Sequence, residues 1–177
     1  MIFLKKPLSV FLACCLFFVL AGCQPKETVT ARDLMHKNFR CHMTVSVLGS
    51  LFEGNFEKTS DKAMSFTLDK PALLSGLCFD YDDGTVSLQA GGFSFSLEAD
   101  GLPDEAVTDV VFDLFGGDDT KNSLSFRKDF ILLRHEGKHL VSFAEFDPHT
   151  LVPQKVYTES GNIEILLSDY ELIKEAP

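Results

Sequence analysis

Apolar and polar residues alternate with a period of two along most of the chain beyond residue 40. In residues 41–47 the odd positions are apolar and the even positions polar, as in a β-strand that buries one face. Similar runs follow with turn residues between them, so the first six form an antiparallel meander. The pattern predicts strands at 41–47, 52–56, 64–68, 73–81, 86–90, 93–97, 124–126, 130–134, 140–146, 153–158 and 163–170.

The residues between these runs favour tight turns. Asp82-Asp83-Gly84 contains the Asp-Gly pair typical of a type I′ hairpin, a turn that needs positive φ at both central residues. Gly49-Ser50 and Ser160-Gly161-Asn162 separate other pairs of runs. Short connections of this kind join neighbouring antiparallel strands.

Two segments change to helical spacing. The first runs over residues 31–38 after Thr30, which can cap it, with Asp33 in the place of the capping-box acid. The second follows Gly101-Leu102-Pro103-Asp104-Glu105, where proline and two acids suit a first helical turn, and ends at Gly116-Gly117. Its apolar residues form one wide face that must lie against a sheet: Ala106, Val107, Val110, Val111, Leu114 and Phe115.

The chain begins with an apolar run, Pro7 to Leu20, preceded by Lys5 and Lys6. This run is short for a transmembrane helix and is typical of a secretory signal peptide. We therefore expect residues 1–22 to be a signal peptide and residues 31–177 to form a single domain.

The signal peptide ends in Leu20-Ala21-Gly22-Cys23, which resembles the bacterial lipobox. The resemblance implies that the Cys23 thiol takes a diacylglyceryl group and that a peptidase then cuts before Cys23. Residues 23–30 would be a lipidated linker, and the acyl chains would hold the protein on the extracytoplasmic face of a bacterial cell membrane. The alternatives are an ordinary signal peptide with an accidental cysteine, or an uncleaved anchor.

The composition is acidic, with a formal net charge of −10. Such a chain is repelled by phosphate backbones and by anionic membrane surfaces, so nucleic acid is not an expected partner. Beyond the linker only Cys41 and Cys78 remain. Both are expected on apolar strand faces as buried free thiols, and a disulfide between them stays open as the weaker alternative.

The sequence gives no reason to assign a reaction. His135 and His139 flank Glu136-Gly137-Lys138, but spacing of four does not bring two imidazoles together on a hairpin, so exposed turn histidines are expected and no metal site. Acidic turns such as Asp118-Asp119 lack the pattern of a calcium loop. No nucleophile elbow, phosphate loop or nucleotide fingerprint is present, so we predict no catalytic residue and no cofactor, and rank a hydrolase last.

The segment Phe146-Asp147-Pro148-His149-Thr150-Leu151-Val152-Pro153-Gln154-Lys155 resembles the end of LolA-like lipoprotein carriers. In these proteins a late strand ends in Asp, a Pro-containing turn leads to a second Pro and a Lys, and a last hairpin follows. The order of elements also fits. The resemblance implies an α+β fold: a strongly curved antiparallel sheet of about eleven strands, an unclosed barrel, with two helices as lid or plug.

Family members hold acyl chains or other hydrophobic molecules on the concave side of this sheet. The residues that could line such a cavity here are Met43, Val45, Val47, Phe66, Leu68, Phe79, Tyr81, Phe93, Phe95 and Leu97. The same residues could instead pack a filled core beneath the helices, and alternation does not decide between the two.

Two functions follow from the resemblance. The first is a membrane-anchored, non-enzymatic lipoprotein that binds a lipid or other hydrophobic ligand. The second is an envelope module that binds a partner protein through the same sheet without a ligand. The soluble LolA-like carrier has no lipid anchor. A lipidated Cys23 would therefore make this chain more similar to the membrane-tethered members of the family.

Overall fold

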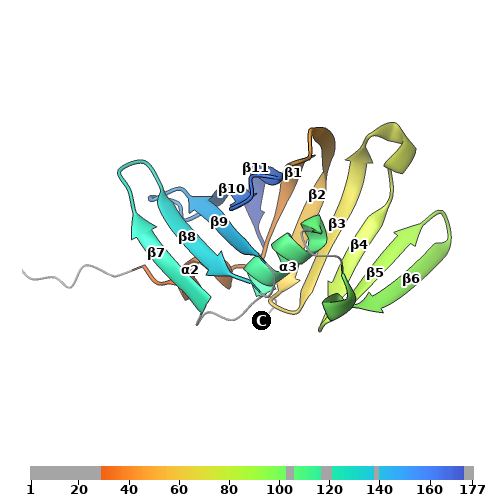
Figure 1. Ribbon diagram of the computed structural model, residues 1–177, viewed down its shortest axis with the longest axis horizontal. Helices are drawn as coiled ribbons and strands as arrows, with labels where there is room; N and C mark the ends of the chain where they lie inside the picture. The colour runs from red at the N-terminus through yellow and green to blue at the C-terminus, as the bar shows by residue number, and fades with distance from the viewer. Residues whose placement is uncertain (1–28, 103–105, 117–120, 138–139, 174–177) are drawn as a thin grey trace, which may run out of the picture.

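One antiparallel sheet of eleven strands organises the molecule (Figure 1). The computed structural model describes residues 29–102, 106–116, 121–137 and 140–173. The strands lie in the order β6-β5-β4-β3-β2-β1-β11-β10-β9-β8-β7, so β6 and β7 are the two edges and the sheet is not closed. The predicted fold class, an unclosed antiparallel barrel of eleven strands with two helices, is confirmed.

The strands follow the predicted alternation closely. They are β1 (Phe39–Val47), β2 (Ser50–Ser60), β3 (Ala63–Lys70), β4 (Cys78–Asp82), β5 (Thr85–Ala90), β6 (Phe93–Glu98), β7 (Asn122–Phe126), β8 (Ile131–Glu136), β9 (Val141–Phe146), β10 (Pro153–Thr158) and β11 (Ile163–Leu172). At the β4–β5 hairpin Asp83 and Gly84 have φ of 42° and 90°, as a type I′ turn requires.

Two α-helices are described, α2 (Ala31–Met35) and α3 (Val107–Gly116). The predicted capping box is present at α2, where Thr30 and Asp33 bond each other's backbone N–H groups. The helix ends at Met35, three residues earlier than expected. The predicted proline and acids at the start of the second helix, residues 103–105, lie outside the described residues.

The predicted strand over residues 73–81 is too long at its beginning. Residues Ala72–Leu74 form the short 3₁₀ helix η1, and β4 starts only at Cys78. Gly76 has a φ of +83°, a conformation that glycine adopts readily and a strand does not use. The apolar residues of this segment therefore belong to a loop at the end of β3.

Helix α3 lies against the concave face of the sheet and fills its middle (Figure 1). The ring of Phe115 lies 5.5 Å from that of Phe39 on β1 and 5.9 Å from that of Phe56 on β2, measured between centroids. Tyr81 of β4 stacks on Phe112 at 5.0 Å. The helix thus closes the core over the central strands and leaves Phe93 and Phe95, at the β6 end of the concave face, exposed.

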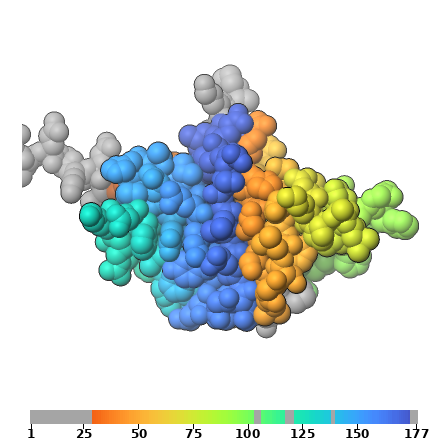
Figure 2. All heavy atoms as spheres, turned by 90° about the horizontal axis from the view of Figure 1, so that it is seen from above, coloured from red at the N-terminus to blue at the C-terminus, as the bar shows by residue number. Residues whose placement is uncertain are grey.

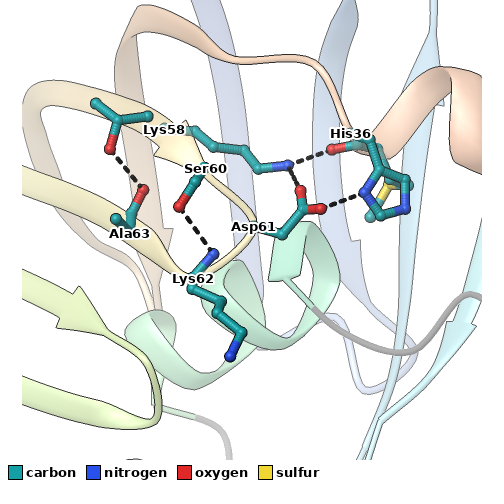
Figure 3. Close-up of polar contacts among 8 residues, drawn as sticks. His36, Lys58, Ser60, Asp61, Lys62 and Ala63 are labelled. Atoms are coloured by element: carbon teal, nitrogen blue, oxygen red, sulfur yellow. Dashed lines mark hydrogen bonds and ion pairs between the residues drawn. The ribbon is translucent and has the colours of Figure 1, made fainter.

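A buried lysine joins both helices to the β2–β3 hairpin (Figure 3). Lys58 is fully buried, and its Nζ donates to the carbonyl oxygen of Met35 and to Oδ1 of Asp61, at 2.5 Å each. The other carboxylate oxygen of Asp61 contacts Nδ1 of His36. A Cβ on Gly116 would lie 2.5 Å from the Asp61 carbonyl oxygen, so the end of α3 packs directly on this turn.

Asp147 organises the turn that carries the family resemblance. Its Oδ1 accepts hydrogen bonds from the backbone N–H groups of His149 and Thr150, both at 2.8 Å. These bonds hold the pKa of the Asp147 carboxyl below its usual value. Leu151 follows in a left-handed conformation, with φ of 57°, and Pro153 starts β10.

The two cysteines lie on opposite faces of the sheet, and both are free thiols. Cys41 is buried on the concave face, where burial raises the pKa of its thiol to about 12. Cys78 pairs with Thr67, is only half-buried and lies on the polar convex face, contrary to expectation. Because the side chains point away from each other through the sheet, the disulfide alternative is wrong.

Candidate functional site

A row of cross-strand partners runs along the concave face from the core to the β6 edge. Phe66 of β3 lies opposite Phe79 of β4, Phe79 opposite Leu88 of β5, and Leu88 opposite Phe95 of β6. Directly opposed residues share one face of a sheet. The row is buried at Phe66, half-buried at Phe79 and Leu88, and 63% exposed at Phe95.

This row leads into an apolar pocket beside the start of α3. The pocket has a volume of about 270 Å³ and lies between strands β1–β4, the loop that contains η1, and the N-terminal end of the helix. Thr108 is its single polar side chain. Its described lining is Val45, Phe52, Phe66, Leu68, Leu74, Leu77, Phe79, Ala106, Val107 and Thr108. Such a surface offers dispersion contact and no hydrogen bond to the hydrocarbon of a ligand.

The floor of the pocket depends on a glycine in β2. Gly54 pairs with Leu68, and a Cβ on Gly54 would lie 2.2 Å from the carbonyl oxygen of Thr67 and 3.0 Å from Cε2 of Phe66. The Phe66 ring therefore lies over backbone that has no side chain. This close approach lets an aromatic ring form the pocket floor without pushing strands β2 and β3 apart.

The ten residues proposed from sequence as cavity lining occupy three environments. Val45, Phe66, Leu68 and Phe79 line the apolar pocket. Met43 is buried in the core, and Val47, Tyr81 and Leu97 are half-buried. Phe93 and Phe95 are exposed, Phe93 by 84%, on the part of the concave face that α3 does not cover.

Six of the ten lining residues were not proposed from sequence: Phe52, Leu74, Leu77, Ala106, Val107 and Thr108. Phe52 was placed on the correct face of its strand but was not assigned to the cavity. Leu74 and Leu77 were assigned to a regular strand, whereas they belong to the loop that contains η1. The signal that could have found the loop is Pro71 followed by Ser75-Gly76, which are turn residues inside an apolar run.

His135 does not lie in an exposed turn as expected. It is in β8, 1% exposed, with its ring nitrogens 2.7 Å from Oδ1 of Asn122 and 3.0 Å from Oδ2 of Asp113 on α3. The period-two alternation with Ile131 and Leu133 places it on the concave face. The side chain thus ties α3 to the sheet. His139 lies outside the described residues.

Two larger hollows contain charged side chains. One of about 500 Å³, between α3 and the β4–β6 strands, has four acidic residues in its lining, Glu98, Asp100, Asp109 and Asp113, beside apolar ones such as Leu102 and Phe112. Another of about 430 Å³ on the convex face is lined mainly by charged and polar side chains. Both disfavour a hydrocarbon chain, so chemistry and not size identifies the smaller apolar pocket as the candidate site.

The described residues show neither a membrane-spanning helix nor a metal cluster. No helix in that part of the chain has the length and hydropathy needed to cross a bilayer. In the same residues no group of three or more His, Cys, Asp or Glu side chains is placed to hold a metal ion.

Comparison by sequence finds nothing: no protein-family profile and no curated protein matches the chain. Comparison by structure finds solved proteins with a similar fold. An uncharacterized conserved protein from Thermus thermophilus superposes with a TM-score of 0.53 at 6% identity, over 82% of this chain and 85% of that one. MucB superposes with a TM-score of 0.51 at 11% identity, over 83% of this chain and 57% of MucB. The fold is LolA-like.

This LolA-like fold is all that such distant similarity establishes. A LolA superfamily protein from Nitrosomonas europaea also matches, over 85% of this chain and 96% of that one, at 10% identity and a TM-score of 0.46. The chain spans little more than half the length of MucB, which has also been solved in complex with MucA. The unclosed sheet of eleven strands confirms the fold that the resemblance of the Asp147 segment implied.

Proposed function

We propose that this chain is a non-enzymatic lipoprotein that binds one hydrocarbon chain of a lipid in the apolar pocket of its LolA-like half-barrel. The observation that carries the proposal is the pocket itself, where nine of the ten described lining residues have apolar side chains. Its 270 Å³ volume is just below the range of roughly 300–1,000 Å³ common for small-molecule sites, which suits a single chain better than a whole lipid.

The surroundings of the pocket support the same function. The apolar surface continues from its mouth through half-buried Leu88 to exposed Phe95 and Phe93, where a longer chain could extend. Each methylene group removed from water contributes about 0.8 kcal/mol, so an acyl chain gains affinity with every carbon that this surface covers. The four acidic side chains of the hollow beside Asp109 and Asp113 of α3 disfavour the negative charge of a headgroup there.

Filling the pocket is expected to block binding. In Ala106→Trp a large ring enters at the start of α3, where Ala106 lines the pocket, and we expect the affinity for a fluorescent fatty acid to fall at least about tenfold. Fluorescence titration measures the affinity. Leu166→Trp, on β11 at a position 47% exposed, is the matched control and keeps the wild-type affinity. Equal affinities in all three proteins would refute the proposed pocket.

We further propose that the domain is attached to the extracytoplasmic face of a bacterial cell membrane through acyl chains on Cys23. This residue lies outside the described residues, and the support is the lipobox-like Leu20-Ala21-Gly22-Cys23 after a charged, apolar leader. A tether of residues 23–30 would hold the pocket close to the bilayer from which a lipid could enter.

Labelling with palmitate tests the attachment. In cells given radioactive palmitate the wild-type chain is expected to carry the label, and Cys23→Ala to lose it completely, because only the Cys23 thiol accepts the diacylglyceryl group. Cys78→Ala, which removes the half-buried thiol of β4, keeps the label. Label that persists in Cys23→Ala, or an unlabelled wild-type chain, contradicts lipid attachment at this residue.

A protein partner in the envelope is the second candidate function. MucB shares the fold and has been solved with MucA bound, and Phe93 and Phe95 give this chain an exposed apolar surface. Crosslinking in cells that recovers a membrane protein, together with a purified domain that holds no lipid by mass spectrometry, would favour this function over the first.

A further inference from the structure

Strand β6 (Phe93–Glu98) is an edge of the sheet that nothing in the described residues covers. Five of its six residues are exposed, and only Leu97 is half-buried. One side of its backbone pairs with β5, and no described strand pairs with the other side. Natural edges are usually protected by lysine, proline or a bulge, and Phe-Ser-Phe-Ser-Leu-Glu has none of these.

The opposite edge is different. Strand β7 (Asn122–Phe126) contacts helix α2, so a described element lies beside that edge. Arg127 and Lys128 follow β7 directly and place positive charge at its end. Figure 2 shows the green β5–β6 hairpin projecting at the far end of the molecule from β7. The two edges thus meet solvent in different ways. Helix α2 contacts β7 and two basic residues follow that strand, whereas no described strand pairs with the outer side of β6 and its one charged residue, Glu98, is at its end.

The sequence of β6 is self-complementary about Phe95. If two copies of the strand pair antiparallel about a two-fold axis at this residue, Phe95 faces Phe95 and Phe93 faces Leu97, all on the concave side. On the convex side Ser94 faces Ser96. The only charged residue, Glu98, faces Gly92 of the second copy.

The absence of charge along residues 89–97 makes this edge suitable for a contact between two copies of the chain. A chain of net charge −10 repels its own copy over most of its surface. Residues 89–97 contain no charged side chain, and the antiparallel register keeps the two Glu98 carboxylates at opposite ends of the contact. The Ser87 and Ser96 hydroxyls already bond at 2.7 Å across β5 and β6, and a second copy's Ser94 would continue this row.

We propose that two copies of this chain join through their β6 strands, antiparallel and centred on Phe95, into one continuous sheet of twice eleven strands. The unpaired backbone groups of both edges are then satisfied, and exposed aromatic rings pair across the axis. The row Phe79, Leu88 and Phe95 continues into the same row of the second copy. Each copy thereby extends the apolar surface beside the other's pocket, although the contact does not depend on a bound ligand.

Crosslinking in membranes tests the register. Full-length chains with Cys78→Ser and either Ser94→Cys or Ser96→Cys are expressed together and oxidised. Directly opposed residues lie within disulfide reach, so the mixture is expected to give at least about tenfold more crosslinked dimer than either chain alone. Equal yields from the single chains and the mixture, or no dimer in any sample, would overturn the proposal.

The mass of the full chain in mild detergent supplies an independent measurement. Light scattering is expected to give twice the monomer mass for the wild type and the monomer mass for Phe95→Lys, which places two like charges on the axis. Phe126→Lys is the matched control, because Phe126 is 61% exposed on β7 as Phe95 is 63% exposed on β6. It is expected to stay dimeric.

Three results would contradict the proposed contact. They are a monomeric wild type, a dimer that persists in Phe95→Lys, or a dimer lost in Phe126→Lys instead. Circular dichroism confirms that each variant is folded, and both substitutions are at exposed positions. A monomeric chain that captures a different protein through β6 also overturns the proposal, because the edge would then serve a foreign strand.

Discussion

Phe115→Ala is expected to lower the free energy of unfolding by about 4 kcal/mol, within the range typical of a buried phenylalanine. The ring is 1% exposed and packs against Phe39 and Phe56, so its loss leaves a cavity between α3 and the central strands. Urea denaturation of the purified protein measures the change.

A matched control separates burial from residue type. Phe126→Ala removes the same side chain from a position 61% exposed and is expected to cost less than about 0.5 kcal/mol. A loss below about 1 kcal/mol for Phe115→Ala would mean that α3 does not anchor the concave core as described.

Asp61→Ala is expected to lower the free energy of unfolding by about 2 kcal/mol. It removes the Asp61 carboxylate that lies 2.5 Å from the fully buried Lys58 ammonium. The effect is smaller than the roughly 3–5 kcal/mol seen when a fully buried pair is broken, because the Asp61 side chain is 39% exposed and partly screened by water. Lys58→Met, which removes the buried charge instead, is expected to cost less.

The ion pair between Lys58 and Asp61 also makes the free energy of unfolding depend on pH. Partial burial alone would raise the pKa of Asp61, but the hydrogen bonds from Lys58 and His36 and their charges outweigh it and hold the pKa below its ordinary value of 3.8. A lowered folded-state pKa stabilises the protein above about pH 4, and this contribution disappears as the pH falls through the folded pKa. The difference between wild type and Asp61→Ala should therefore shrink below about pH 4 and stay constant between about pH 5 and 6.

Alternation along the chain was sufficient to predict the sheet. Each strand buries a single face, so a period of two appears directly in residues such as Cys41, Met43 and Val45. The turn residues predicted the connections between strands. The type I′ turn expected at Asp83-Gly84 is confirmed by the positive φ of both residues. The curvature of the sheet and the position of α3 came from the family resemblance, because local patterns carry no information on closure.

The candidate site was harder to predict, because alternation shows which face a residue occupies but not what covers it. Phe66 and Phe95 belong to the same row, yet one is buried at the pocket and the other exposed at the edge. Lys58 and His135 fit the buried face by spacing and were still unexpected there, since their burial depends on Asp61 and Asp113, which come from other segments.

Gly54 has a consequence for the evolution of this chain. With the Thr67 carbonyl 2.2 Å from where its Cβ would be and the Phe66 ring at 3.0 Å, positions 54 and 66 share one volume. A larger residue at 54 is compatible with the pocket only if the aromatic ring at 66 becomes smaller and the strands shift. Substitution at position 54 is thus restricted to changes paired with position 66.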